Sequence, residues 1–204
     1  MRIGLFGGTF DPIHIGHMII MENVINFMNL DKIYILPNSN PPHKLENKKT
    51  NINLRLKMIE KSIKNNPKLS INDYDFKDNK IHYTYKTINH FKITYPNDEF
   101  FFILGEDSFM DLEKWKNYQE ILDENLIIFK RKSGKNSSLL FKINEIKKYN
   151  KNIYLIDNLS LDISSTLIRN LVKNNKSIRY LVDDDVIKII EEENLYVWFF
   201  KIWG

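Results

Sequence analysis

Residues Gly4–Met18 read GLFGGTFDPIHIGHM and join a strand, a glycine-rich loop and the start of a helix. The apolar run at residues 2–6 is typical of a buried strand, and an apolar helix is predicted from Gly16 to Asn29. Ligands of open parallel sheets bind where the strands end, so the loop is placed to meet one. Gly7 and Gly8 let the backbone approach a phosphate, and the N–H groups that begin the helix favour the same anion.

His14 and His17 lie three residues apart at the start of this helix, so both side chains can face one ligand. There they could hydrogen-bond to phosphate oxygens whose charge grows during a transfer reaction. A metal-binding pair and ordinary surface histidines are the alternatives for this spacing. The loop is neither a Walker A motif nor a G-x-G-x-x-G fingerprint, so the nucleotide class is left open.

Strand and helix patterns alternate along the rest of the chain. This order predicts an α/β fold with βαβ units, built as a Rossmann-like doubly wound sheet that is mainly parallel. Strands are expected at residues 32–37, 69–73, 100–104, 125–130 and 152–156. Helical patterns cover residues 54–64, 84–91, 107–122, 164–172 and 184–192. We expect residues 130–138 to form a mobile loop within a lysine-rich segment that extends to residue 151.

We expect one compact domain over residues 1–204, with a small helical portion at about residues 163–195. The aromatic tail at residues 197–204 is expected to pack against the domain or a second subunit, so a homo-oligomer is an open possibility. The net charge of +4 fits a polyanionic small molecule as well as RNA, and no nucleic-acid partner is expected. The absence of cysteine, of a signal-peptide pattern and of a spanning apolar run predicts a cytoplasmic protein without a membrane partner.

A second phosphate-binding pattern stands near the C-terminus, where residues 163–172 read ISSTLIRNLV. Ser164 or Ser165 can cap the helix and offer hydroxyl and amide groups to a phosphate. Arg169 lies about one turn along and can reach the same anion. A plain helix cap followed by a surface arginine is the alternative interpretation.

Together these motifs resemble the nicotinate/nicotinamide mononucleotide adenylyltransferases, especially the bacterial-type nicotinate enzyme, of the H-x-G-H nucleotidyltransferase superfamily. Further similar segments are ILPNSNPPHK, YTYKTI, ILGEDSFMDLEKW, IIFKR and IRYLVDDDVIKIIEEENLY, and they cover nearly the whole chain. The HIGH tetrapeptide at residues 14–17 also marks class I aminoacyl-tRNA synthetases. No KMSKS-like loop or tRNA-binding module accompanies it, and the chain is short for such an enzyme.

The resemblance implies adenylyl transfer from ATP to nicotinate mononucleotide and leaves nicotinamide mononucleotide open as a second acceptor. The products are deamido-NAD or NAD and pyrophosphate, and Mg²⁺ is the implied cofactor, held by phosphates without dedicated metal ligands. The implied ATP-binding residues are Gly7, Gly8, Thr9, Phe10, His14, His17, Gly105, Asp107, Ser164, Ser165 and Arg169, among which His14, His17 and Arg169 are catalytic. The implied mononucleotide-binding residues are Thr9, Asn38, Lys44, Tyr83, Thr84, Trp115 and Arg131.

Two other functions stay open at this point. A phosphopantetheine adenylyltransferase of the same superfamily would share the histidines and the C-terminal serine and arginine. A non-catalytic nucleotide- or RNA-binding protein of the same fold would account for the basic charge. Glu106 and Asn117 depart from the family pattern without an interpretation. Trp115 and Asp107 also fit a core position and a helix cap, respectively.

Overall fold

In the computed structural model, the described residues are 1–38, 49–77, 82–130, 137–157 and 162–197. Within them, six strands form one sheet in the order β3-β2-β1-β4-β5-β6. The strands are β1 Arg2–Gly8, β2 Lys32–Pro37, β3 Leu69–Ile71, β4 Glu99–Gly105, β5 Asn125–Phe129 and β6 Ile153–Ile156. Every neighbouring pair is parallel, which confirms the predicted doubly wound sheet. The strand order reverses between β1 and β4, where a ligand is expected.

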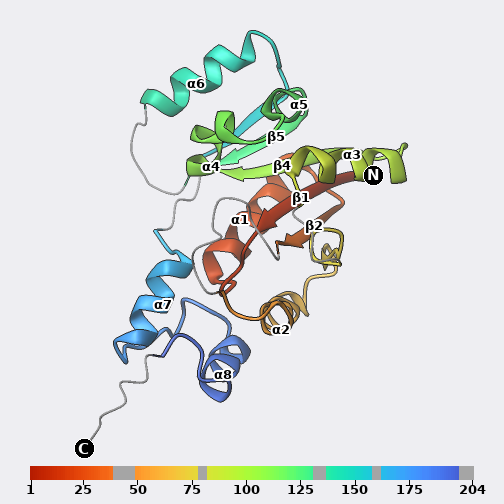
Figure 1. Cartoon of the computed structure of the whole chain (residues 1–204). Helices are drawn as coiled ribbons and strands as arrows, with labels where there is room; N and C mark the ends of the chain where they lie inside the picture. Colours follow the sequence, from red (N-terminus) through yellow and green to blue (C-terminus); the bar gives the residue numbers. More distant parts are fainter. Residues whose placement is uncertain (39–48, 78–81, 131–136, 158–161, 198–204) are drawn as a thin grey trace, which may run out of the picture.

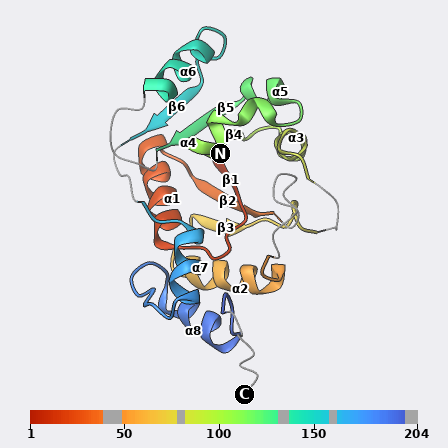
Figure 2. The ribbon, with the colours of Figure 1, turned by 60° about the vertical axis from the view of Figure 1, so that its left-hand side comes forward.

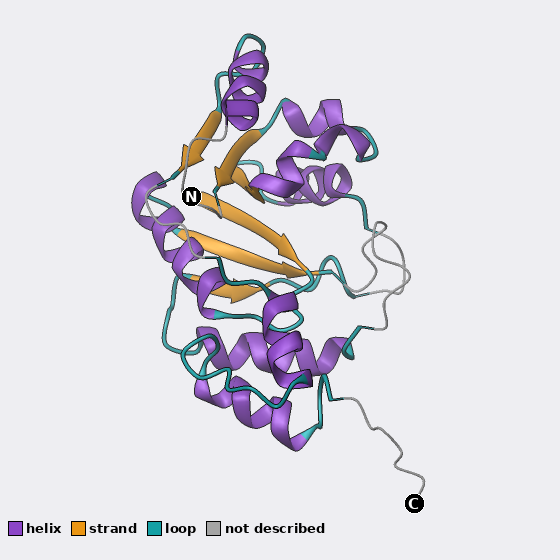
Figure 3. Cartoon of the chain, turned by 90° about the vertical axis from the view of Figure 1, so that its left-hand side faces the viewer, coloured by secondary structure: helices purple, strands orange, loops and turns teal. Residues whose placement is uncertain are grey.

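The central strands are apolar and buried over their middle residues because both faces of the sheet are covered. Phe100–Leu104 in β4 is buried at every position, and so is Ile3–Phe6 in β1. One apolar cluster lies on the face that carries α1 (Ile15–Met28), α2 (Ile52–Ile63), α7 (Ser165–Lys173) and α8 (Asp184–Glu192). Figures 2 and 3 show these helices packed beside the sheet.

The second apolar cluster lies on the opposite face of the sheet. It carries α3 (Thr84–Thr94), α4 (Glu106–Met110), the short 3-10 helix η1 (Leu112–Lys114), α5 (Tyr118–Leu122) and α6 (Ser137–Lys147). Figure 1 shows α3, α5 and α6 on the side of the sheet away from α8. Helices on both faces of a parallel sheet are the arrangement that the alternating strand and helix patterns predict.

Two expectations about helices are wrong. Residues 107–122 do not form one amphipathic helix, because Trp115 is extended and Asn117 has a left-handed backbone with φ of 53°. The chain therefore divides into α4, η1 and α5, although Phe109 and Leu112 are buried as expected. A loop was predicted over residues 130–138, but α6 already begins at Ser137. Residues 131–136 of that prediction lie outside the described residues. Leu139 and Ile143, one turn apart, bury that helix's apolar side.

The C-terminal helices are fixed to the N-terminal half of the chain. The backbone N–H of Ile15 at the start of α1 donates to the Leu181 carbonyl oxygen at 2.8 Å. The ammonium group of Lys64, just after α2, lies 2.7 Å from Asp185 of α8. No helix in the described part of the chain is both long and apolar enough to cross a bilayer. Of the predicted aromatic tail, only Val197 lies within the described residues.

Candidate active site

A cavity of about 1000 Å³ opens where the strand order reverses, at the carboxyl ends of β1 and β4. Its wall contains every described residue that the sequence predicts for the two substrates: Gly7, Gly8, Thr9, Phe10, His14, His17, Asn38, Tyr83, Thr84, Gly105, Asp107, Trp115, Ser164, Ser165 and Arg169. Lys44 and Arg131 lie outside the described residues. The structure thus gathers these side chains around one space, while their individual binding roles stay predictions.

The glycine-rich loop is shaped by the aromatic ring of Phe10. A Cβ atom at Gly8 would lie 2.8 Å from this ring, so only glycine fits there without a shift. Phe10 itself has φ of 48°, in the left-handed region that costs an L-residue energy. Its buried ring packs edge-on against Phe6 and His17, with centroid distances of 5.5 and 5.0 Å. The Phe10 ring therefore anchors the glycine-rich loop to the core, and the opposite side of the loop faces the cavity.

The two histidines form a stacked pair at the start of α1. Their ring centroids are 3.6 Å apart, and only 5% of His14 and 8% of His17 is exposed. The backbone N–H of His14 donates to Nδ1 of His17 at 3.3 Å. Because that nitrogen accepts a hydrogen bond, the neutral ring of His17 carries its proton on Nε2, which makes Nε2 a donor to an oxygen. This tautomer suits a phosphate oxygen better than a metal ion.

The start of α7 completes the same end of the cavity. The Ser164 hydroxyl caps the helix by accepting from the Leu167 N–H at 3.1 Å, whereas the Ser165 hydroxyl donates to the Pro12 carbonyl at 2.9 Å. Nη1 of Arg169 donates to the Asp11 carbonyl at 2.8 Å. The N-termini of α1 and α7 therefore meet beside an arginine and two histidines, and helix N-termini attract phosphates.

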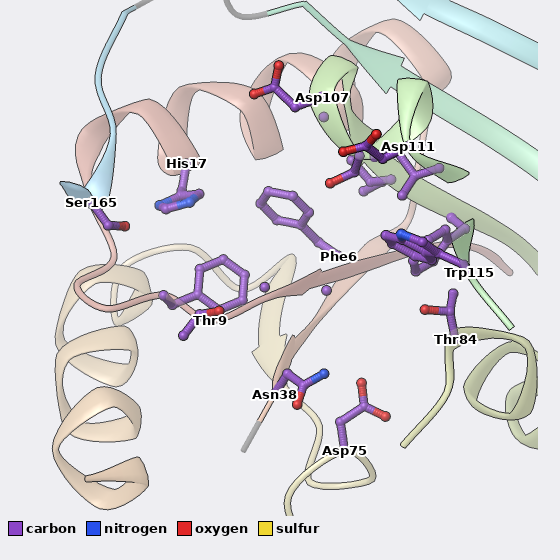
Figure 4. Close-up of a pocket in the computed structure, with 18 of the residues that line it drawn as sticks. Phe6, Thr9, His17, Asn38, Asp75, Thr84, Asp107, Asp111, Trp115 and Ser165 are labelled. Atoms are coloured by element: carbon purple, nitrogen blue, oxygen red, sulfur yellow. The ribbon is translucent and has the colours of Figure 1, made fainter. Parts of the chain in front are cut away.

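The opposite end of the cavity is aromatic. Figure 4 shows Trp115 and Thr84 on one side and His17 and Ser165 on the other, with Asp107 and Asp111 along the upper edge between them. Gly105 is the N-cap of α4 and Asp107 lies in its first turn, so Asp107 is not the cap residue. The cavity wall includes the aromatic rings of Trp115 and Tyr83. One end is thus suited to phosphate and the other to flat rings, and the carboxylates between them can accept hydrogen bonds from ribose hydroxyls.

Lysines flank the aromatic end of the cavity. The Lys116 ammonium group lies 4.8 Å from the centroid of the Tyr83 ring, a cation–π contact that holds it beside the N-terminus of α3. Lys114, two residues earlier, lies 2.5 Å from the Asp111 carboxylate instead. Both lysines line the cavity, but only Lys116 is directed toward the tyrosine.

Two polar residues of the site were missed by the sequence analysis. Asp75 is 7% exposed and lines the cavity, where it accepts a hydrogen bond from the Thr87 hydroxyl at 2.8 Å. Burial raises the pKa of Asp75, and the Thr87 hydrogen bond and His82 oppose the rise. Arg55 is 1% exposed and donates to three loop carbonyls. An aspartate in a polar loop and an arginine in an amphipathic helix carry no sequence signal of burial.

Residues 5–171 match the family model described as Cytidylyltransferase-like. A protein of Clostridium novyi named "Probable nicotinate-nucleotide adenylyltransferase" is 40% identical over 195 residues, covering 95% of this chain and 98% of that protein. A Clostridium botulinum protein of the same name is 43% identical over 198 residues, covering 96% and 98%. The structure of Plasmodium falciparum nicotinic acid mononucleotide adenylyltransferase complexed with NaAD has a TM-score of 0.79 and 25% identity, covering 96% of this chain and 97% of that one.

The fold and the two-ended cavity place this chain among the nucleotidyltransferases. Within that class, the chain belongs to the cytidylyltransferase-like family and to its nicotinate-nucleotide adenylyltransferases. The resemblance predicted from the sequence motifs is confirmed. The HIGH tetrapeptide is therefore not evidence of a tRNA-charging enzyme.

Proposed function

We propose that this chain transfers the adenylyl group of ATP to nicotinate mononucleotide, with release of pyrophosphate and formation of deamido-NAD. The observation that carries the proposal is the two-ended cavity. Two helix N-termini, two histidines and Arg169 converge at one end, and Trp115, Tyr83 and Thr84 at the other. The relatives' names supply the acceptor, and the cavity supplies matching chemistry. A cytoplasmic location belongs to the proposal because both substrates are intracellular metabolites.

The chemistry requires no protein nucleophile. The attacking phosphate of the mononucleotide is already anionic, so positioning and charge stabilisation carry the catalysis. In the proposal, His14 and His17 donate hydrogen bonds to ATP phosphate oxygens. The Nε2–H of His17 donates to the oxygen on which negative charge develops during the transfer. Arg169 and the N-terminus of α7 stabilise the pyrophosphate as it leaves. The bond from Arg169 to the Asp11 carbonyl keeps the guanidinium beside the loop that carries the histidines.

The other residues position the two substrates. Gly105 and Asp107 are assigned to the adenosine, with the Asp107 carboxylate accepting from ribose hydroxyls. Trp115 is assigned to stack on the pyridine ring, with Thr84 at the N-terminus of α3 near its carboxylate. Asn38 is assigned to the phosphate of the mononucleotide. Thr9 is assigned to both substrates, because its loop also faces the ATP phosphates. Each of these groups lines the cavity, which supports the assignments.

Mg²⁺ belongs to the proposal as the companion of the ATP phosphates. Among the described residues, no three histidine, aspartate or glutamate side chains come together as a ready-made metal site. A hydrated ion held mainly by phosphate oxygens needs no such cluster of protein ligands. Such an ion would neutralise phosphate charge during the transfer.

Pyrophosphate release tests this proposal. The purified chain is incubated with ATP, Mg²⁺ and one acceptor, which is nicotinate mononucleotide, nicotinamide mononucleotide or phosphopantetheine. We expect turnover with the pyridine mononucleotides and a higher kcat/KM for the nicotinate form. Turnover with phosphopantetheine alone would identify the other adenylyltransferase. Absence of turnover with all three, in protein that binds ATP or RNA, would support a binding protein instead.

A further inference from the structure

Arg55 is a buried cation placed under two loops of the active site. It lies in the first turn of α2 and is 1% exposed. Nη1 donates to the carbonyl oxygens of Thr9 at 2.7 Å and Asn38 at 3.1 Å, and Nε donates to the carbonyl oxygen of Thr50 at 3.0 Å. Thr9 and Asn38 line the cavity, whereas Arg55 does not. Any effect of Arg55 on the reaction therefore passes through these loops.

The charge of Arg55 is balanced by a network that includes Tyr196, which follows α8. Burial lowers the pKa of Arg55, and the Asp11 carboxylate and Tyr196 counteract this. The Asp11 carboxylate accepts from the Thr50 N–H at 3.3 Å and from the Tyr196 hydroxyl at 2.7 Å. Every member of this network bonds to a loop that borders the cavity or precedes α2. A buried ionic group is a weak source of stability and is better suited to specifying one geometry.

The hydrogen bonds of Arg55 control how the glycine-rich loop presents its backbone. In a planar trans peptide, the N–H of Phe10 points opposite to the Thr9 carbonyl oxygen. Because Arg55 holds that oxygen, the Phe10 N–H is directed away from Arg55. Phe10 also has a left-handed backbone with φ of 48°, which persists only when the surroundings enforce it. Arg55 supplies part of that enforcement from beneath the loop.

The same guanidinium fixes the spacing between two loops with different assignments. The loop after β1 faces the ATP phosphates in the proposed function, and Asn38 follows β2 on the mononucleotide side. The Asn38 N–H also donates to the Gly8 carbonyl at 2.9 Å, so the two loops are joined beside Arg55. A shift of about an ångström between reacting groups can lower a rate about a hundredfold.

We infer that Arg55 is a positioning residue that sets the relation between the two bound substrates by holding the Thr9 and Asn38 carbonyls together. The inference rests on the proposed adenylyl transfer. Arg55→Lys is the decisive variant. It keeps a cation near Asp11 but removes the planar group that reaches several carbonyls at once. Arg55→Met is the more severe companion, because it also removes the charge.

Met58→Ala is the matched control. Met58 lies one turn further along α2, is fully buried in the apolar cluster, and is bonded to neither loop through its side chain. All variants are assayed for pyrophosphate release below their unfolding temperatures, with the acceptor that the wild-type protein uses. We expect Arg55→Lys to lower kcat about tenfold or more while both KM values change less than about threefold. Met58→Ala should lower the unfolding temperature and leave kcat near the wild-type value.

Two results would overturn the inference. The first is wild-type kcat in folded Arg55→Lys protein. The second is a loss of activity that follows the loss of stability in the same proportion for the Arg55 variants and for Met58→Ala. Arg55 would then be a structural residue only. Failure of the proposed function looks different, because the wild-type protein itself would turn over none of the acceptors. In that case the variants are compared by ATP binding, and loop positioning predicts weaker ATP binding for Arg55→Met than for Met58→Ala.

Discussion

Gly16→Ala tests whether the stacked histidines act in the reaction. Gly16 is the second residue of α1, between His14 and His17. A Cβ atom there would lie 3.0 Å from Nδ1 and 3.1 Å from Cε1 of His14. Separations below 3.4 Å are tighter than ordinary van der Waals contact, so the His14 ring must move by several tenths of an ångström. The helical backbone accepts alanine, which favours the helix by about 1 kcal/mol over glycine.

The effect on stability should be small and the effect on rate large. Crowding a buried group costs about 1–3 kcal/mol, and the helix preference offsets about 1 kcal/mol of this. The net loss of about 0–2 kcal/mol corresponds to a fall in Tm of at most about 8 °C for a chain of this size. His14 is stacked at 3.6 Å on His17, so its displacement also disturbs the second ring. We expect kcat to fall about tenfold to a hundredfold.

The assay is pyrophosphate release at saturating ATP and nicotinate mononucleotide, with thermal denaturation measured in parallel. A double-mutant cycle with His14→Ala isolates the cause. If Gly16→Ala acts through the His14 ring, it should lower the rate little further in the His14→Ala background. The reasoning is refuted if Gly16→Ala has wild-type kcat, or if it lowers kcat by the same factor whether or not His14 is present.

Three further predictions concern charges in and below the cavity. In the proposed function Thr84 lies near the pyridine carboxylate, and the Lys116 ammonium group lies against the neighbouring Tyr83 ring. Lys116→Met should therefore lower kcat/KM for nicotinate mononucleotide about three- to tenfold relative to the nicotinamide form. Lys114→Met is the control, and an equal change in kcat/KM for the two acceptors would contradict the idea. Asp75→Asn should raise Tm at pH 7. Burial holds the pKa of this carboxyl above its usual range, so Asp75 contributes less stability as the pH rises through the folded-state value. The gain should vanish below about pH 3.9, where both states are protonated, and a pH-independent gain would refute this origin. Tyr196→Phe should lower the unfolding free energy in urea by about 1–3 kcal/mol, since the buried Asp11 carboxylate loses a donor at 2.7 Å; an unchanged midpoint would show that the bond contributes nothing.

Most of the sheet was predictable because its strands are buried on both faces. Lys32–Pro37 and Asp184–Glu192 match the expected strand and helix at both ends. The interruption after Trp115 was not predictable, because apolar spacing continues through the residues that break the helix. Asn117 adopts a left-handed backbone there, and asparagine does so without forming a distinctive pattern. Helix α6 was not predicted because it lies in a lysine-rich segment and buries only two aliphatic residues, Leu139 and Ile143.

The cavity was predictable for a different reason. Phosphate-binding sites use glycine where the backbone approaches the anion, and serine or histidine where a side chain donates. Such residues stand at fixed distances from strand and helix ends, so the pattern is visible in the sequence. Arg55 and Asp75 act through burial and through loop carbonyls or hydroxyls that only the folded chain brings near. Charged residues in helices and loops are mostly exposed, so the sequence favours the wrong environment for both.

The most direct test of the account is the single-turnover rate of adenylyl transfer in His17→Ala. Protein in excess over ATP is mixed with Mg²⁺ and saturating nicotinate mononucleotide, and deamido-NAD formation is followed together with ATP binding. The account predicts a folded variant that binds ATP within a few-fold of wild type but transfers the adenylyl group about a hundredfold or more slowly. A transfer rate near that of the wild-type protein would contradict the claim that this buried histidine pair stabilises the reacting phosphate.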